Sequence, residues 1–345
     1  MDDPARDGGP GRFAPGAGPT ISPHGARLAG SCTEPARAKV NLALHVTGRR
    51  GDGFHTLDTL VAFPPIADTV TVTAAGDGGG FGLTVDGPFA AAVPTGPDNL
   101  VLRAAARLAA GYGAAADAPA IALAAGPDAS VGAPPTANRL AAAHIRLTKA
   151  LPVAAGLGGG SSDAAATLRA LDRLWSLGLD PGRLADLGRP LGADVAMCVH
   201  ARPLRATGIG DVVDRFVALP AAGIVLVNPG VAVPTPAVFS ILARRDNPPL
   251  PPLPDRFTDA ADLAAWLRLG RNDLEAAART VAPAIGDVLA ALSSDPEVLL
   301  ARLSGSGATV FALTADAASA DRIGARITGL GRPWWVAAAA LDAPG

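Results

Sequence analysis

The chain has 345 residues, of which 49% are hydrophobic, and its 29 basic and 31 acidic side chains give a formal net charge of −2. This length allows two domains of ordinary size, whereas the near-neutral charge provides no basic stripe for nucleic acid. Apolar runs stay well short of the roughly 18 residues that a membrane-spanning helix needs. We therefore expect a soluble protein with a small-molecule partner, no membrane association and no obligate protein partner.

Residues 1–34 are rich in glycine and proline and lack the apolar run of a signal peptide, so they predict a flexible N-terminal tail. Two cysteines, Cys32 and Cys198, are too few for a disulfide framework and lack the spacing of a zinc site. A cytoplasmic location is therefore the default. The only two lysines, Lys39 and Lys149, become candidates for sites that need a compact ammonium group.

The stretch 36–46, ARAKVNLALHV, alternates in character and predicts a half-buried strand, with Lys39 and Asn41 on the face opposite Val40. A turn, GRRGDG, follows it. Strand-like runs continue up to Asp98 between glycine, proline and aspartate clusters, at residues 55–63, 68–74 and 81–85. This region predicts an antiparallel sheet, and residues 99–113 predict the first helix.

A strand at 141–152 leads into a glycine-rich loop, PVAAGLGGGSS, and then into a helix at 161–178. Backbone N–H groups at a helix start carry about half a positive charge, so a loop without side chains allows a phosphate to approach them. Ser161 or Ser162 is expected to cap this helix and Gly178 to close it. The predicted phosphate loop consists of Pro152, Val153, Ala154, Ala155, Gly156, Leu157, Gly158, Gly159, Gly160, Ser161 and Ser162.

The loop matches neither of two common nucleotide motifs. A Walker A motif requires Gly-Lys-Ser/Thr after the glycines, and a dinucleotide fingerprint requires glycine where Ser161 stands. A structural turn is the remaining alternative. From residue 209 onward we expect a second α+β domain, with strands at 223–230, 309–315 and 333–340 and helices at 236–243, 259–268, 273–293 and 315–328.

LPVAAGLGGGSSDAAATL resembles the phosphate-binding motif of the GHMP kinases. Further stretches, ARAKVNLALHVTGRRGDGFHTLDTL, LGADVAMCVH, NPGVAVPTPAVF, RNDLE and LSGSGATVFAL, resemble in content and order the family within them that phosphorylates 4-diphosphocytidyl-2-C-methyl-D-erythritol. The resemblance implies a two-domain α+β GHMP kinase fold, with a ribosomal-protein-S5-like N-terminal domain (residues 35–208) and a ferredoxin-like C-terminal domain (209–345). It also implies ATP as phosphoryl donor, accompanied by Mg²⁺, in the non-mevalonate isoprenoid pathway.

The resemblance also suggests roles for individual residues. Asp194 would be the catalytic base, and Lys39 would hold it ionised and contact the substrate. Asn41 and Thr235 would lie near the substrate. Phe54 would stack on the cytosine, His55 would hydrogen-bond the edge of the base, and Phe239 would form the second wall of the cytosine slot. Each has an ordinary alternative: a solvated side chain for Asp194, Lys39 and Asn41, and a core or turn residue for the aromatic three. Lys149 could be a surface lysine, and the turn 304–307 a plain turn.

Three other functions remain open on the sequence. Another GHMP enzyme, such as a mevalonate-type or homoserine kinase, would share the phosphate loop but not the Phe54 and His55 pair. A silent metabolite-binding protein of the same fold would lack the base that Asp194 supplies. A dinucleotide-dependent oxidoreductase is disfavoured by Ser161.

Overall fold

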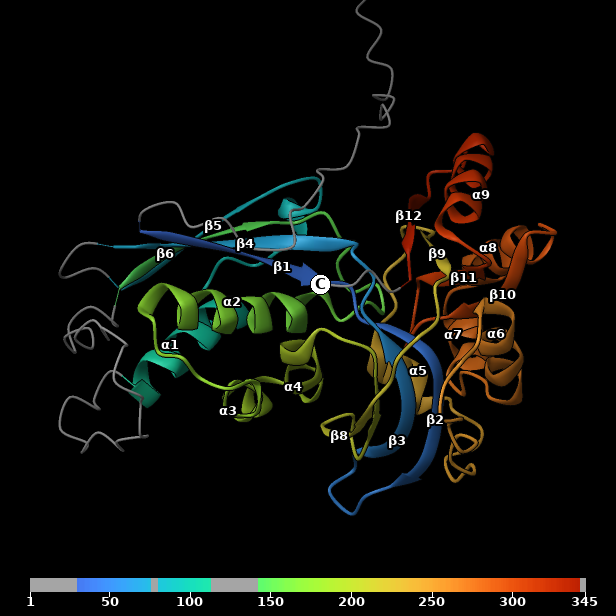
Figure 1. Cartoon of the computed structure of the whole chain (residues 1–345), viewed down its shortest axis with the longest axis horizontal. Helices are drawn as coiled ribbons and strands as arrows, with labels where there is room; N and C mark the ends of the chain where they lie inside the picture. The colour runs from blue at the N-terminus through green and yellow to red at the C-terminus, as the bar shows by residue number, and fades with distance from the viewer. Residues whose placement is uncertain (1–29, 76–79, 113–141, 342–345) are drawn as a thin grey trace, which may run out of the picture.

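The computed structural model describes residues 30–75, 80–112 and 142–341. They form two halves that each combine helices with a β-sheet, as predicted, with strands β2 and β3 between them (Figure 1). Most of the predicted tail lies outside the described residues. Its last five residues do not: Gly30 is followed by strand β1 (Ser31–Arg37), which pairs with β4 (Ala67–Ala74), so the tail prediction is wrong from Ser31 onward. The reason is the alternation of this strand, which buries Cys32, Glu34 and Ala36 on one face.

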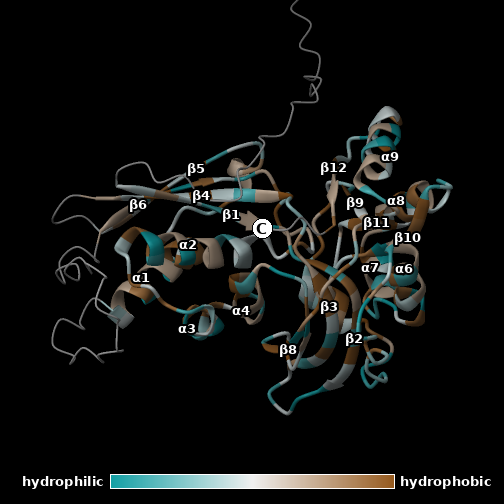
Figure 2. Ribbon diagram, viewed as in Figure 1, coloured by the Kyte–Doolittle hydropathy of each residue, from teal (hydrophilic) through white to brown (hydrophobic). Residues whose placement is uncertain are grey.

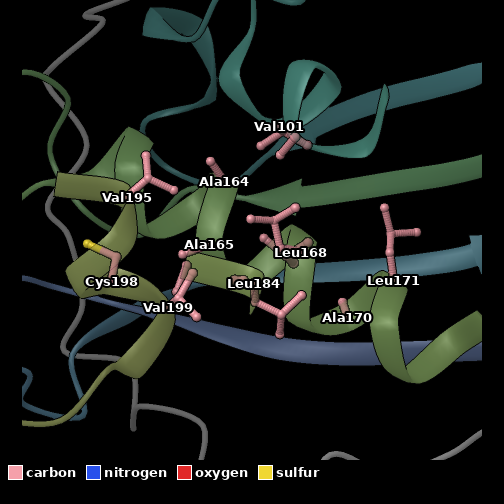
Figure 3. Close-up of a cluster of buried hydrophobic side chains, with 14 of the residues drawn as sticks. Val101, Ala164, Ala165, Leu168, Ala170, Leu171, Leu184, Val195, Cys198 and Val199 are labelled. Atoms are coloured by element: carbon pink, nitrogen blue, oxygen red, sulfur yellow. The ribbon is translucent and has the colours of Figure 1, made fainter. Parts of the chain in front are cut away.

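The N-terminal sheet has the order β1-β4-β6-β5, where β5 is Phe81–Asp86 and β6 is Ala143–Thr148. Helices α2 (Gly159–Trp175) and α1 (Leu100–Tyr112) cover one of its faces, and α3 (Pro181–Gly188) and α4 (Ala193–His200) pack against α2 on the side away from the sheet (Figure 1). Helix α2 is therefore central to the helices of this half. Figure 3 shows its small and branched side chains packed against α1, α3 and α4 through Val101, Leu184 and Val195.

A second sheet has the order β2-β3-β7-β8, formed by Val40–Arg49, His55–Ala62, Leu204–Thr207 and Val212–Phe216. The strands before Asp98 therefore belong to two sheets rather than one. They are also not wholly antiparallel, because β5 runs parallel to β6. Strand β8 pairs with β7 through the glycine-containing turn 208–211, so the N-terminal half extends beyond the predicted boundary at residue 208 and ends before β9.

Strand β2 was expected to be half-buried, and this is wrong: its first seven residues, from Val40 to Val46, are buried on both faces. Val40 and Leu42 share a core with Ile224 and Phe311 of the C-terminal half, so a strand of the first half is covered by the second. Figure 2 shows apolar residues along β2 and β3 and a hydrophilic hairpin beyond them.

The C-terminal sheet has the antiparallel order β10-β11-β9-β12, formed by Val298–Leu303, Val310–Thr314, Gly223–Asn228 and Trp335–Ala340. Taken in chain order with the intervening helices, this is the βαββαβ arrangement of the predicted ferredoxin-like domain. The helices are α5 (Thr235–Ser240), α6 (Ala260–Leu269), α7 (Glu275–Val281), α8 (Ala284–Ser293) and α9 (Ala317–Gly329). The single helix expected at 273–293 is two helices, because Pro283 interrupts it. Across the described residues, none of the helices is long and apolar enough to cross a membrane.

Candidate active site

One cavity of 1010 Å³ contains most of the residues that the sequence singled out. Its walls come from β2, the β2–β3 hairpin, the phosphate loop, α4 and α5, together with Gly305 and Ser306 of the second glycine turn. The structure brings together Lys39, Asn41, Phe54, His55, Asp194, Thr235 and Phe239 on these walls. Four residues of the predicted phosphate loop do not line the cavity: Pro152, Val153, Leu157 and Ser162.

The phosphate loop turns into helix α2 without the predicted serine cap. The N-cap is Gly158, in a left-handed conformation with φ 61°, and helix α2 begins at Gly159. Ser161 and Ser162 therefore lie within the first turn, where their own N–H groups belong to the helix start. At the other end, the C-cap is Ser176, in a left-handed conformation with φ 55°, and the predicted Gly178, which also has a positive φ, lies two residues beyond it. The helix N-terminus, with its partial positive charge, faces the cavity through Gly159 and Gly160.

Two of the loop glycines are required by neighbouring protein atoms. A Cβ on Gly156 would lie 2.4 Å from the carbonyl oxygen of Ser304, so the phosphate loop and the turn 304–307 are in direct contact. A Cβ on Gly158 would lie 3.1 Å from the side chain of Lys39. The cluster therefore serves close packing of the loop against the site as well as access for a phosphate.

Lys39 and Asp194 form an ion pair at the centre of the cavity. The Nζ of Lys39 lies 2.8 Å from Oδ2 of Asp194, across 155 residues of sequence. The lysine side chain is 8% exposed and the aspartate 34%, so the carboxylate remains accessible from the cavity. Asp194 lies in the first turn of α4, where the helix dipole favours its negative charge. A Cβ on Gly210 would come within 3.4 Å of the other oxygen, Oδ1, so glycine keeps that side open.

Asn41 lies beside this pair with one free acceptor. Its amide nitrogen Nδ2 donates to Oγ1 of Thr59 at 2.8 Å, and its backbone N–H donates to Oγ of Ser304 at 3.1 Å. Its Oδ1 is buried and has no hydrogen-bond partner within the described residues. Because buried polar atoms are normally paired, this oxygen is available to a hydroxyl group of a ligand in the cavity. Thr235 is held nearby by a 2.7 Å hydrogen bond with Ser306.

Two of the three aromatic residues are stacked on each other. The rings of His55 and Phe239 have centroids 4.6 Å apart and planes inclined by 21°. His55 therefore covers one face of the Phe239 ring, and the role of Phe239 as the second wall of a cytosine slot stays a prediction. Phe54 is 60% exposed and lines the cavity. These three residues are called the base site below.

His55 is neutral at physiological pH and has one free ring nitrogen. Desolvation by burial, followed by the charges of Arg245 and Arg49, lowers its pKa from the usual value. Its Nε2 is buried without a partner among the described residues. A neutral imidazole with a free nitrogen can hydrogen-bond the edge of a base, as the sequence comparison implied.

Lys149 is not a surface residue, because its side chain is only 3% exposed. Its Nζ bonds Oδ2 of Asp163 at 2.8 Å and also contacts Asp68, and we call these three residues the buried triad. Asp68 also accepts backbone N–H bonds from Ala150 and Leu151, at 2.6 and 2.8 Å, just before the phosphate loop. A Cβ on Gly159 would lie 3.4 Å from the lysine Nζ. The triad therefore contacts both ends of the phosphate loop and supports it from the protein interior.

The two carboxylates of the triad share one ammonium group, so one of them retains a proton. Asp68 accepts two backbone hydrogen bonds that favour its charged form, whereas Oδ1 of Asp163 is buried without a partner. Burial, opposed by the charge of Lys149, raises the pKa of Asp163 to about 8. Neither Asp68 nor Asp163 was recognised from the sequence, because the chain does not show that either of them meets Lys149.

We expect this arrangement to make stability fall as pH rises. The folded pKa of Asp163, about 8, exceeds the reference 3.8, so the folded protein holds an extra proton between these values. The stabilisation is complete below the lower pKa and is lost as pH rises through the upper one. Asp163→Asn keeps an acceptor for Lys149. At pH 9 its free energy of unfolding should exceed that of wild type by on the order of 1–3 kcal/mol.

The matched control for this prediction is Asp321→Asn, an exposed acid on α9, which should leave the pH profile unchanged. Urea titrations at pH 6 and pH 9 make the comparison. If the wild-type and Asp163→Asn proteins lost equal stability between these pH values, the protonated state of Asp163 would be refuted.

Comparisons with known proteins agree with the geometry. The family model of the GHMP kinases N terminal domain matches residues 99–202, and that of the GHMP kinases C terminal region matches 255–332. A curated 4-diphosphocytidyl-2-C-methyl-D-erythritol kinase of Dinoroseobacter shibae is 45% identical over 307 residues, covering 89% of this chain and 93% of its own. One of Paracoccus denitrificans is 47% identical over 313 residues, covering 89% and 96%.

Solved structures give the same picture. A crystal structure of a 4-(cytidine 5'-diphospho)-2C-methyl-D-erythritol kinase matches with a TM-score of 0.67 and 32% identity, covering 90% of this chain and 100% of that one. A homoserine kinase from Cytophaga hutchinsonii matches with a TM-score of 0.60 at 20% identity, covering 93% and 98%, and so shares the fold.

Proposed function

This chain belongs to the 4-diphosphocytidyl-2-C-methyl-D-erythritol kinases of the GHMP family, and from that premise we propose how its residues carry out the reaction. The enzyme transfers the γ-phosphoryl group of ATP to the 2-hydroxyl of 4-diphosphocytidyl-2-C-methyl-D-erythritol, in the non-mevalonate route to isopentenyl diphosphate. The observation that carries the assignment of residues is the Lys39–Asp194 pair, placed in one cavity with the phosphate loop and the base site.

Asp194 is the group that takes the proton of the substrate hydroxyl. Its Oδ2 is fixed by Lys39 at 2.8 Å, and Oδ1 faces the open side beside Gly210. A carboxylate is a weak base for an alcohol. It accepts the proton late, when bond formation to phosphorus has made the hydroxyl acidic, and before that it orients the hydroxyl for attack.

Lys39 has two functions in this proposal. Its ammonium holds the Asp194 carboxylate in position, and as a cation that lines the cavity it stabilises the negative charge of the transferred phosphoryl group. Asn41 supplies a free acceptor, Oδ1, for another hydroxyl of the substrate. The three side chains together fix the reacting alcohol relative to the phosphate loop.

ATP binds with its phosphates against the loop at the start of helix α2, where Gly158, Gly159, Gly160 and Ser161 line the cavity. The residues present also fit Mg²⁺, which prefers phosphate oxygens, water and only a few protein ligands. Ser161 is the hydroxyl we assign to it, because the hydroxyl of Ser162 instead bonds Sγ of buried Cys198 at 3.3 Å. When bound, the metal neutralises charge on the phosphate oxygens. No cluster of three metal-binding side chains occurs within the described ranges, so the nucleotide would supply most of the ligands.

Phe54 provides the stacking surface for the cytosine, next to the supported ring of His55. Phe54→Ala should therefore raise the KM for the cytidylylated alcohol by on the order of 10-fold, the effect of losing one base–aromatic stack. The KM for ATP should stay near the wild-type value. Steady-state kinetics with each substrate varied in turn measure both constants.

The matched control for Phe54 is Phe216→Ala, which removes a ring that is 39% exposed but does not line the cavity. It should change neither constant. Equal increases in both KM values for Phe54→Ala would contradict a role in binding the base.

A homoserine or mevalonate kinase activity would need the same phosphate loop, but a shared fold at 20% identity or less does not support either. The base site distinguishes the proposed reaction from these two, because neither homoserine nor mevalonate carries a cytosine. The product provides the test of the proposed reaction: phosphorus NMR of a complete turnover should show one new phosphate monoester attached at the tertiary carbon. A new monoester on a primary hydroxyl would contradict the assignment of Asp194 to the 2-hydroxyl.

A further inference from the structure

The sequence contains two Arg-Arg pairs whose members have different environments. Arg50 pairs with Asp52 at 2.7 Å, and Arg244 pairs with Asp246 at 3.2 Å, both at the surface. Their neighbours Arg49 and Arg245 instead line the cavity. Within the described part of the chain, neither of these two has a carboxylate within ion-pair distance. In each pair, therefore, one guanidinium is neutralised by a neighbouring carboxylate, and the other can bind an anionic ligand in the cavity.

Both unpaired arginines lie at the base site. Arg49 is opposite His55 in the β2–β3 register, and its Nε donates to the carbonyl of Gly53 at 3.2 Å. Arg245 follows helix α5, which carries Phe239, and donates from Nη2 to the carbonyl of Ser240 at 3.2 Å. The charges of both arginines help to lower the pKa of the His55 ring, so both lie near it.

Each guanidinium is anchored by one backbone hydrogen bond and keeps several free donors. An arginine has five N–H donors in a planar fork, and Arg49 and Arg245 each use one position in the contacts described above. The Nε of Arg245 is buried and has no partner in the described residues. Anchored forks with unused donors are suited to phosphate oxygens, which accept paired hydrogen bonds.

We propose that Arg49 and Arg245 bind the diphosphate of the substrate, so that this end of the cavity selects a nucleoside diphosphate rather than a nucleoside. The inference rests on the proposed function, in which the cytosine occupies the base site. In a cytidine 5′-diphosphate ester the anionic group is separated from the base only by the ribose, so cations next to the base site meet it. The erythritol then continues from the diphosphate toward Lys39 and Asp194.

The test compares the binding of cytidine, CMP and CDP to the whole enzyme by calorimetry. Wild type should bind CDP more tightly than cytidine by on the order of 10- to 100-fold, the effect of charge-assisted hydrogen bonds. In the Arg49→Gln/Arg245→Gln double variant this ratio should fall to within about 3-fold, while cytidine binds as before. Arg50→Gln and Arg244→Gln are the matched controls, because they remove the neighbouring, paired charges.

A second readout separates electrostatic selection from a structural effect. Arg245→Lys keeps the charge but not the fork, so it should restore part of the CDP preference that Arg245→Gln loses. A CDP-to-cytidine ratio in the double variant equal to that of wild type would overturn the proposal. So would an equal loss of cytidine and CDP binding, which would place the arginines on the base instead.

Turnover distinguishes this inference from the proposed function. If wild type phosphorylates the cytidylylated alcohol and the ratio is insensitive to the arginines, only the diphosphate assignment fails. If wild type binds CDP through the arginines but phosphorylates no cytidylylated alcohol, the proposed function fails, and with it the assignment of a substrate diphosphate.

Discussion

Replacing Asp194 by asparagine is expected to lower kcat by about 10²- to 10⁴-fold, the contribution of a general base. Asparagine has nearly the same shape and still accepts a hydrogen bond from Lys39, but it cannot take a proton. The phosphate loop and the buried triad do not contact Asp194, so ATP should bind with wild-type affinity. Single-turnover kinetics and ATP titration by fluorescence measure the two quantities separately.

Asp186→Asn serves as the control for Asp194, since Asp186 is an exposed acid on neighbouring helix α3 whose partner is Arg189. It should leave kcat unchanged. Full activity of Asp194→Asn would remove this residue from the mechanism. A loss of ATP affinity as large as the loss of kcat would mean that it holds the nucleotide site together rather than the hydroxyl.

Replacing Lys149 by methionine is expected to lower the free energy of unfolding by about 3–5 kcal/mol, as when one partner of a buried ion pair is removed. Two buried carboxylates, Asp68 and Asp163, would lose the ammonium group between them. Because Asp68 also holds the chain just before the phosphate loop, the KM for ATP should rise at temperatures where the protein remains folded. Urea unfolding and ATP kinetics test the two parts.

Arg146→Met is the control for Lys149, because it removes a basic residue from strand β6, which ends just before Lys149, and its ion pair with Asp86 is at the surface. It should change stability by no more than about 1 kcal/mol. At pH 9, above the pKa of Asp163, adding Asp163→Asn to Lys149→Met should recover part of the loss, since an acid that ionises there has been replaced by a neutral side chain. A Lys149→Met protein as stable as Arg146→Met would show that the triad does not support the loop.

The sequence predicted the general fold because its local signals agree with one another. Strand-like alternation, helix periodicity and the strand–loop–helix order of residues 141–178 all reappear in the structure. Errors occur where distant segments decide the outcome. Strand β2 was expected to have a polar, solvated face, but the C-terminal half covers it. Strand β8 was assigned to the wrong half because hairpin pairing with β7 leaves no trace in a short polar run.

The sequence identified many residues of the candidate site, but it did not show how they are arranged in space. Lys39 and Asp194 are 155 residues apart, and only the family resemblance connected them before the structure placed them 2.8 Å apart. The stacking of His55 on Phe239 could not be read from the chain, because it depends on how α5 meets the β2–β3 hairpin. Asp68, Asp163, Arg49 and Arg245 were missed for the same reason: nothing in the chain shows which distant side chain each charge meets.

ADP release with Mg·ATP is the most direct measurement of the central claim. Purified enzyme would be given 4-diphosphocytidyl-2-C-methyl-D-erythritol or, in parallel, the methylerythritol phosphate that lacks the cytidylyl group. The account predicts rapid ADP release with the first substrate and little with the second, because the base site and the phosphate loop must both be engaged. Equal turnover of the two alcohols, or of neither by an enzyme that binds ATP, would contradict it.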